Sequence, residues 1–297
     1  MSTPFPWLIT LGLFLASTSA LTAAEQPPSR EEAIAEIEKL GGEIKQPPRL
    51  PVVKVELRMV PLTSESLAKI KGLKEMQWLN AGYCGIDDVG ATHLAELTQL
   101  EYLELSNNGV TDLGLKSLAR LEKLGSLELD STKITGAGLV HLAGLKGLHS
   151  LDLKNTQVGD DGLAHLASME ALQDLDLGST VVSNAGLKHL QGLKGLLHLG
   201  LSGTKVTDAG LAALAGMKTL ERLELGQTGV TDVGLAHVSG LTGLQQLILT
   251  GTAVTDAGLE QLKGLSQLVF LDVTQSKVTE KGAAALLTRI PGINIQR

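Results

Sequence analysis

The sequence predicts an α/β fold, a curved solenoid or horseshoe with a concave parallel sheet and convex helices. The main observation is a 24-residue unit that occurs ten times between Val52 and Pro291 without insertion. Fixed periods of this size are typical of solenoids, in which each unit buries its apolar face against its neighbours. The units start at Val52, Met76, Leu100, Leu124, Leu148, Leu172, Leu196, Leu220, Leu244 and Leu268.

A second observation is that the apolar spacing changes within each unit, whose positions we number from its first residue. In the unit that starts at Leu148, Leu151 and Leu153 occupy positions 4 and 6 and alternate as in a strand with one face inward. Positions 16, 19 and 22 lie on one face of a short helix. They are filled by Leu163, Leu166 and Met169. Since strands lie about 4.7–4.9 Å apart and packed helices about 8–10 Å apart, the sheet is expected to be concave.

Polar residues and glycine mark the turns of the unit. Thr and Asp at positions 12 and 13, such as Thr231 and Asp232, suit a helix start, where a side-chain oxygen accepts from a free backbone N–H. Glycine at position 15, such as Gly234, costs about 0.5–1 kcal/mol within a helix. We expect that its missing side chain lets the helix lie close to the strand layer. Thr or Asn108 at position 9 is expected to satisfy the backbone after the strand.

The repeat reads LxxLxLxxTxVTDxGLxxLxxLxx and resembles leucine-rich-repeat proteins of the ribonuclease-inhibitor-like superfamily, in a bacterial exported type with 24-residue repeats. The resemblance covers ten units, or about 240 of the 297 residues. It implies a horseshoe that binds other proteins and seldom catalyses a reaction.

The N-terminal segment, residues 1–24, is predicted to be a signal peptide. An apolar run from Trp7 to Ala16 precedes small residues, with cleavage after Ala24 or Ala20. Because no Lys or Arg precedes the run, an uncleaved membrane anchor is the alternative. Cleavage would place the protein in the bacterial periplasm or outside the cell, without stable membrane insertion.

The segments that flank the repeats are predicted to close the solenoid. Residues 25–51 contain a linker and an amphipathic helix, in which Ser29 and Glu32 are spaced as a capping box. This helix is interpreted as the N-terminal cap, with an independent partner-binding helix as the alternative. Residues 52–291 hold the ten repeats, and residues 292–297 are expected to add a closing strand through Ile293 and Ile295.

Composition and motifs argue against several functions. The net charge of −7 disfavours a nucleic-acid-binding face, and the lone cysteine, Cys84, permits no intrachain disulfide and no cysteine-based metal site. No nucleophile elbow, zinc-protease or phosphate-loop motif occurs, so we expect neither an enzyme nor a cofactor. The histidines at position 18 are interpreted as solvated convex residues or as a pH-sensitive surface, because neighbouring helices lie too far apart for zinc. They are His93, His141, His165, His189 and His237.

The strand positions that face away from the core, 3, 5, 7 and 8, form the predicted concave surface. Position 5 is acidic in seven of ten units, and Asp130 and Asp174 at positions 7 and 3 enlarge the acidic patch. Three interpretations remain: polar residues that keep the sheet soluble, a binding strip for a basic protein or peptide, and a divalent-cation site, most plausibly for calcium. Position 5 holds Glu56, Asn80, Glu104, Glu128, Asp152, Asp176, Gly200, Glu224, Ile248 and Asp272.

Aromatic residues flank this patch, with three in the early units and Phe270 in a late one. Exposed Trp and Tyr favour interfaces, although the N-terminal cap and its linker could instead cover these strands. The predicted partner-binding residues are Trp78, Tyr83, Tyr102, Glu104, Glu128, Asp130, Asp152, Asp174, Asp176 and Glu224.

Together these patterns predict an exported module that binds a protein partner, possibly basic, through its acidic concave face. The alternative is a structural or scaffolding component of the cell envelope without a single partner. The sequence specifies neither the partner nor the oligomeric state.

Overall fold

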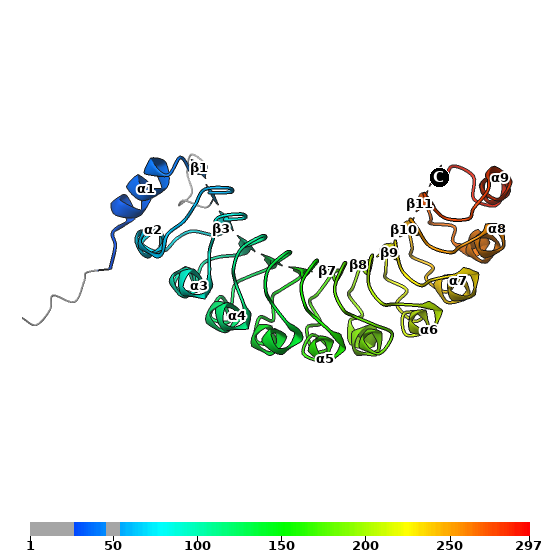
Figure 1. Cartoon of the computed structure of the whole chain (residues 1–297), viewed down its shortest axis with the longest axis horizontal. Coiled ribbons are helices and arrows are strands. Elements are labelled where there is room, and N and C mark those ends of the chain that lie inside the picture. The colour runs from blue at the N-terminus through cyan, green and yellow to red at the C-terminus, as the bar shows by residue number, and fades with distance from the viewer. Residues whose placement is uncertain (1–26, 46–53) are drawn as a thin grey trace, which may run out of the picture.

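The predicted α/β solenoid is confirmed in a computed structural model, which describes residues 27–45 and 54–297. The described part of the chain forms an open arc, with one sheet along the inner, concave side and the helices along the outer side (Figure 1). The predicted signal peptide, residues 1–24, lies outside the described residues, as do residues 46–53 of the predicted linker and first repeat.

The strands of the described residues form one twelve-stranded sheet, which follows the order of the chain. Strand β1 pairs antiparallel with β2, and β2 to β12 are parallel. From β2 onward the paired residues are 24 apart in sequence, as for Leu151 and Leu175, so each repeat position forms a column across the sheet. The strands are β1 (Glu43–Lys45), β2 (Lys54–Glu56), β3 (Trp78–Asn80), β4 (Tyr102–Glu104), β5 (Ser126–Glu128), β6 (Ser150–Asp152), β7 (Asp174–Asp176), β8 (His198–Gly200), β9 (Arg222–Glu224), β10 (Gln246–Ile248), β11 (Phe270–Asp272) and β12 (Asn294–Gln296).

The convex layer mixes short α-helices with 3₁₀ helices. Threonine at position 12 caps several of them, and Thr231 accepts a hydrogen bond from the Val233 N–H at 3.3 Å. The α-helices are α1 (Arg30–Lys39), α2 (Ser64–Ile70), α3 (Asp88–Leu94), α4 (Asp112–Leu118), α5 (Asp160–Leu163), α6 (Asp208–Leu211), α7 (Asp232–Val238), α8 (Asp256–Leu259) and α9 (Glu280–Arg289). The 3₁₀ helices are η1 (Gly136–Leu142), η2 (Gly186–Gly192) and η3 (Glu260–Gly264).

The core is one continuous stack of aliphatic side chains between the two layers. In the unit that starts at Leu148, the seven apolar side chains are each at most 1% exposed to solvent. They are Leu148, Leu151, Leu153, Val158, Leu163, Leu166 and Met169. At the N-terminal end, Ala33 and Ile37 of α1 are fully buried in the same cluster, and the Ser29–Glu32 capping box is formed in both directions. Helix α1 therefore covers the end of the stack, as its amphipathic pattern predicts.

An unforeseen row of hydrogen bonds joins neighbouring units. Asp232 at position 13 accepts from both the backbone N–H and the hydroxyl of Thr255, at 2.7 and 2.6 Å, in the next unit. The same pairing occurs in Asp88–Thr111, Asp112–Thr135, Asp160–Ser183, Asp208–Thr231 and Asp256–Thr279. In Asn184–Thr207 the side-chain amide accepts from the backbone N–H and donates to the hydroxyl. We call this row the inter-repeat ladder.

The ladder accounts for the glycine at position 15. A Cβ atom on Gly258 would overlap the Oδ1 of Asp232, and the position 15 glycines that likewise face a carboxylate of the preceding unit are Gly114, Gly138, Gly186, Gly234 and Gly282. The expectation that this glycine lets the helix approach the strand layer was therefore wrong. Glycine instead leaves room for the carboxylate of the preceding unit.

Candidate functional site

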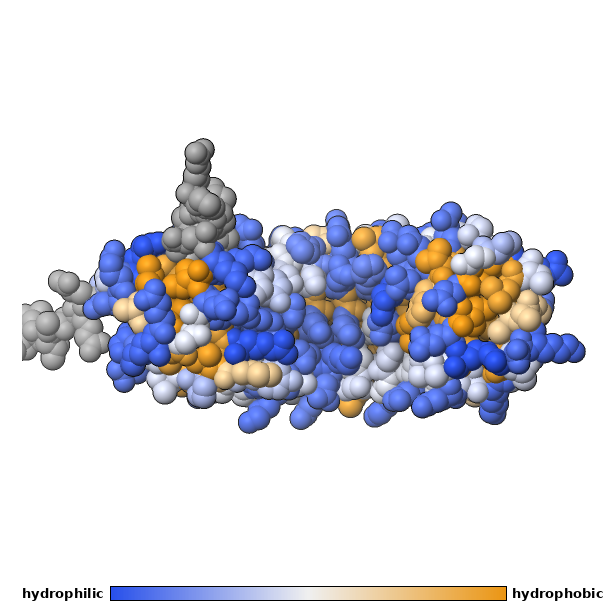
Figure 2. Space-filling model, turned by 90° about the horizontal axis from the view of Figure 1, so that it is seen from above, coloured by the Kyte–Doolittle hydropathy of each residue, from blue (hydrophilic) through white to orange (hydrophobic). Residues whose placement is uncertain are grey.

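The concave face presents the position 3 and position 5 columns on either side of the buried leucine at position 4. Figure 2 looks down into this face and shows mainly hydrophilic residues in its middle, with larger hydrophobic areas towards both ends. The predicted partner-binding residues belong to this face and its rim, but their environments differ.

A stack of side chains occupies the N-terminal part of the position 3 column. The rings of Trp78 and Tyr102 are stacked with centroids 4.7 Å apart and an interplanar angle of 8°, and Lys54 Nζ lies 4.9 Å from the Trp78 ring centroid. The spacing matches the distance between paired strands, so the register itself imposes the stack. The Tyr102 hydroxyl donates to Glu128 Oε1 at 2.7 Å, which connects the aromatic residues to the acidic ones.

Tyr83 lies in a turn rather than on a strand. Every residue at position 8 from Met59 to Gln275 has a positive φ, between 53° and 72°. Position 8 was expected on the strand face, but this left-handed backbone ends the strand and directs the side chain to the rim. Tyr83 is 47% exposed there, and the Arg58 guanidinium lies 5.6 Å from its ring centroid.

Glu104 is buried, contrary to the expectation that it is a central, exposed charge. It is only 8% exposed, because its carboxylate leans over Gly82, where a Cβ atom would lie 2.6 Å from Oε1. Burial, followed by the charge of Glu128, raises the pKa of Glu104. The nearby Ser106 hydroxyl is the one fully buried side-chain polar atom without a hydrogen-bond partner in the described structure. Glu104 therefore adds charge beneath the surface but offers little area for contact.

Four carboxylates in the middle of the face form what we call the central acidic strip: Glu128, Asp130, Asp152 and Asp176. Each accepts hydrogen bonds only from neutral donors. These donors are the Tyr102 hydroxyl for Glu128, the Asn107 side-chain amide and Ser131 hydroxyl for Asp130, the backbone N–H of Lys154 for Asp152 and the backbone N–H of Gly178 for Asp176. None of the four forms an ion pair with a described lysine, arginine or histidine.

Two carboxylates of the strip, Asp152 and Asp176, have raised pKa values. Burial raises the pKa of Asp152 to about 6 against the opposing hydrogen bond from the Lys154 N–H, and the charges of Asp176, Asp130 and Glu128 add to the rise. Burial likewise raises the pKa of Asp176. Partly desolvated carboxylates that form no ion pair favour the binding of a positive group.

The acidic residues at the C-terminal flank of the strip are already paired. Asp174 contacts His198 on the next strand, and Glu224 Oε1 lies 2.7 Å from Arg222 Nη2 on its own strand. Sequence reasoning selected the acidic residues and missed His198 and Arg222. Both occupy position 3, so a comparison of that column with the adjacent acidic column could have found them.

Two other features offer no site in the described structure. Residues 27–45 and 54–297 contain no group of three or more His, Cys, Asp or Glu side chains suited to hold a metal, so the cation interpretation has no ligand set there. Cys84 is buried, its thiol donates to the Leu57 carbonyl at 2.9 Å, and burial raises its pKa. Cys84 thus fills the turn column as an un-ionised thiol.

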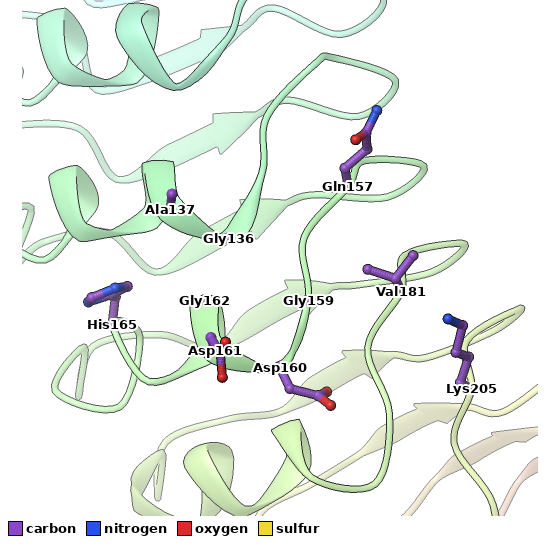
Figure 3. Close-up of a pocket in the computed structure, with 10 residues that line it drawn as sticks. All are labelled: Gly136, Ala137, Gln157, Gly159, Asp160, Asp161, Gly162, His165, Val181 and Lys205. Carbon is purple, nitrogen blue, oxygen red and sulfur yellow. The ribbon is translucent and has the colours of Figure 1, made fainter.

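A recess of about 610 Å³ lies on the flank of the solenoid where the inter-repeat ladder is interrupted (Figure 3). Gly136 and Gly159 replace the ladder's Asp and Thr, and a Cβ atom on Gly162 would lie 2.5 Å from Gly136 Cα. His165 and Lys205 stand on opposite sides of the recess in Figure 3, so its polar groups do not converge as a catalytic site requires.

Comparisons with known proteins agree with the geometry. The family model described as Leucine rich repeat matches residues 98–158, and a second Leucine Rich repeat model matches residues 196–215. An internalin C2 structure from Listeria monocytogenes superimposes with a TM-score of 0.58 at 21% identity, over 78% of this chain and 91% of that one. The fold is a leucine-rich-repeat solenoid.

An internalin (InlF) structure from the same organism gives a TM-score of 0.49 at 18% identity, over 93% of this chain and 98% of the other. Among curated proteins, none matches this solenoid in sequence. In the described part of the chain, the helices are too short or too polar to cross a membrane.

Proposed function

We propose that this leucine-rich-repeat solenoid is an exported, non-enzymatic interaction module whose concave face binds a basic protein partner. The observation that carries the proposal is the central acidic strip, four neighbouring carboxylates that form no ion pair within the described chain. A folded protein keeps unpaired, partly desolvated charges of one sign together at a cost in stability, and a cationic partner relieves that cost.

The surroundings of the strip support the same function. The stacked Trp78 and Tyr102 border it on the N-terminal side, and aromatic residues with few rotatable bonds are favoured at interfaces. The concave curvature lets several strands contact one partner at once. Export rests on the apolar run near Trp7, and the leucine-rich-repeat fold agrees with a role in protein binding.

The proposal is tested by affinity capture with three baits made from the mature chain. The first is the wild type, and the second replaces three strip residues, Glu128→Gln, Asp130→Asn and Asp152→Asn. The third is a matched control that removes the same charge from exposed residues outside the strands, Glu122→Gln, Glu170→Gln and Glu260→Gln. Quantitative mass spectrometry compares the proteins that each bait retains from the native envelope fraction.

We expect one dominant, stoichiometric and basic protein on the wild type and the control, and its loss from the strip variant. Retention of that protein by the strip variant would place the partner site elsewhere. Several partners of no common charge, retained equally by all three baits, would favour the scaffolding function instead.

A further inference from the structure

A glycine interrupts the acidic column of the concave face. Gly200 on β8 is the only glycine at position 5 in the ten repeats, and it stands between Asp176 on β7 and Glu224 on β9. The missing side chain leaves a recess of about 210 Å³ over the sheet. Its polar lining comes from Asp174, Asp176, His198, Arg222 and Glu224.

The side chains around Gly200 limit the volume of the recess, in addition to the missing side chain of the glycine itself. A Cβ atom on Gly200 would overlap the Oδ1 of Asp176, so the Asp176 carboxylate already leans over the glycine. Leu175 and Leu199 of the buried column complete the floor. A space of this kind fits the end of one extended side chain and excludes a folded segment.

The charges around the recess are paired except for one. His198 contacts Asp174, and Arg222 donates to both Glu224 and Gln246. These side chains on two sides of the recess therefore already have partners within the chain. Asp176 has only the Gly178 N–H as a donor, at 2.7 Å, and forms no ion pair with a described residue. Asp176 is thus the one carboxylate lining the recess without a side-chain partner among the described residues.

We propose that the Gly200 recess binds one lysine side chain of the basic partner, with its ammonium group on Asp176. This inference rests on the proposed function and assigns the chemistry of one contact within it. Lysine suits the geometry better than arginine, because Asp176 Oδ1 already accepts the Gly178 N–H. The remaining oxygen suits a compact point charge rather than a planar, bidentate guanidinium.

The test uses N-acetyl-tetralysine amide as the probe and backbone-amide NMR of the mature chain as the readout. Gly200→Ala fills the recess at a residue with ordinary strand dihedral angles, and the only side chain that must move is that of Asp176. Asp176→Asn removes the charge while an oxygen remains to accept from the Gly178 N–H. Gly226→Ala is the matched control, because Gly226 follows the next strand and does not line the recess.

We expect saturable shifts of the Asp176 and Gly200 amides in the wild type. The dissociation constant should rise at least about fivefold, equivalent to ~1 kcal/mol, in both Gly200→Ala and Asp176→Asn, and stay unchanged in Gly226→Ala. Unchanged tetralysine binding by folded Gly200→Ala and Asp176→Asn would overturn the proposal that the recess binds a lysine side chain. Equal or tighter binding of N-acetyl-tetraarginine amide at the same amides would overturn the choice of lysine.

The outcome separates this inference from the proposed function. If the strip variant loses tetralysine binding while Gly200→Ala keeps it, the acidic strip binds the cationic probe as proposed, and the assignment of the recess as a lysine site is wrong. If tetralysine shifts no concave amide, the recess is also wrong, and affinity capture alone decides the proposed function.

Discussion

Removal of one carboxylate from the inter-repeat ladder should weaken the whole solenoid. Asp232→Ala deletes two hydrogen bonds to Thr255, of 2.7 and 2.6 Å, and leaves the Thr255 backbone N–H without its acceptor. Hydrogen bonds to charged groups contribute about 1.5–3 kcal/mol each, and partial exposure places this pair at the low end. We therefore expect Asp232→Ala to lower the free energy of unfolding by about 2–3 kcal/mol.

The chain provides its own control for this prediction. At the equivalent position Asn184 accepts from the Thr207 N–H and donates to the Thr207 hydroxyl, both at 2.8 Å. Asp232→Asn should therefore cost less than about 1 kcal/mol, because amide and hydroxyl can exchange roles. Urea unfolding followed by circular dichroism measures both variants, and an unchanged m-value shows that the cooperative unit is the same. Equal losses for the Ala and Asn variants, or a loss below about 0.5 kcal/mol for Asp232→Ala, would refute the ladder as a source of stability.

Three further predictions use the same urea measurement. Gly258→Ala should cost about 1–2 kcal/mol through overlap with Asp232, and a double-mutant cycle should show the penalty disappear in the Asp232→Ala background. Asp152→Asn should add about 1–2 kcal/mol at pH 8 and much less at pH 4, because a carboxyl whose folded pKa is raised from 3.8 to about 6 destabilises the fold increasingly as pH rises through that range. Equal gains at both pH values would contradict this. Leu175→Asp, at a 2% exposed site, should cost at least ~3 kcal/mol, against less than about 0.5 kcal/mol for His165→Ala, and similar losses would contradict the inward assignment.

The periodic features could be predicted because each depends on one unit alone. Leu151 in β6 and Leu153 just after it are both buried, as their alternation predicts. The predicted helix is correct at Leu163 but wrong at Leu166 and Met169, because α5 ends at Leu163 and these two buried residues lie in the segment that follows it. The constant step then places each residue beside its equivalent 24 residues away, which predicts the stack of Trp78 on Tyr102 as soon as both are assigned to position 3.

Features that depend on contacts between different positions of different units could not be predicted in this way. Asp232 and Thr255 are 23 residues apart, so the period of 24 does not relate them, and each alone reads as an ordinary helix cap. Glu104 is buried only because Gly82 at a different position leaves space for it. The pairing of His198 with Asp174 differs, because both occupy position 3 and the step of 24 places them side by side.

The most direct test of the central claim is the salt dependence of association between the mature chain and its captured partner. Stopped-flow or surface-based kinetics at low and at physiological ionic strength would compare the wild type, the strip variant and the matched control. Since screening acts over about 8–10 Å at physiological salt, steering by the central acidic strip should appear mainly in the association rate. We predict slower association of the strip variant at low salt and a smaller salt dependence, with the control equal to the wild type. If the strip variant associates as fast as the wild type at low salt, the unpaired carboxylates serve solubility alone, and the account of the concave face is wrong.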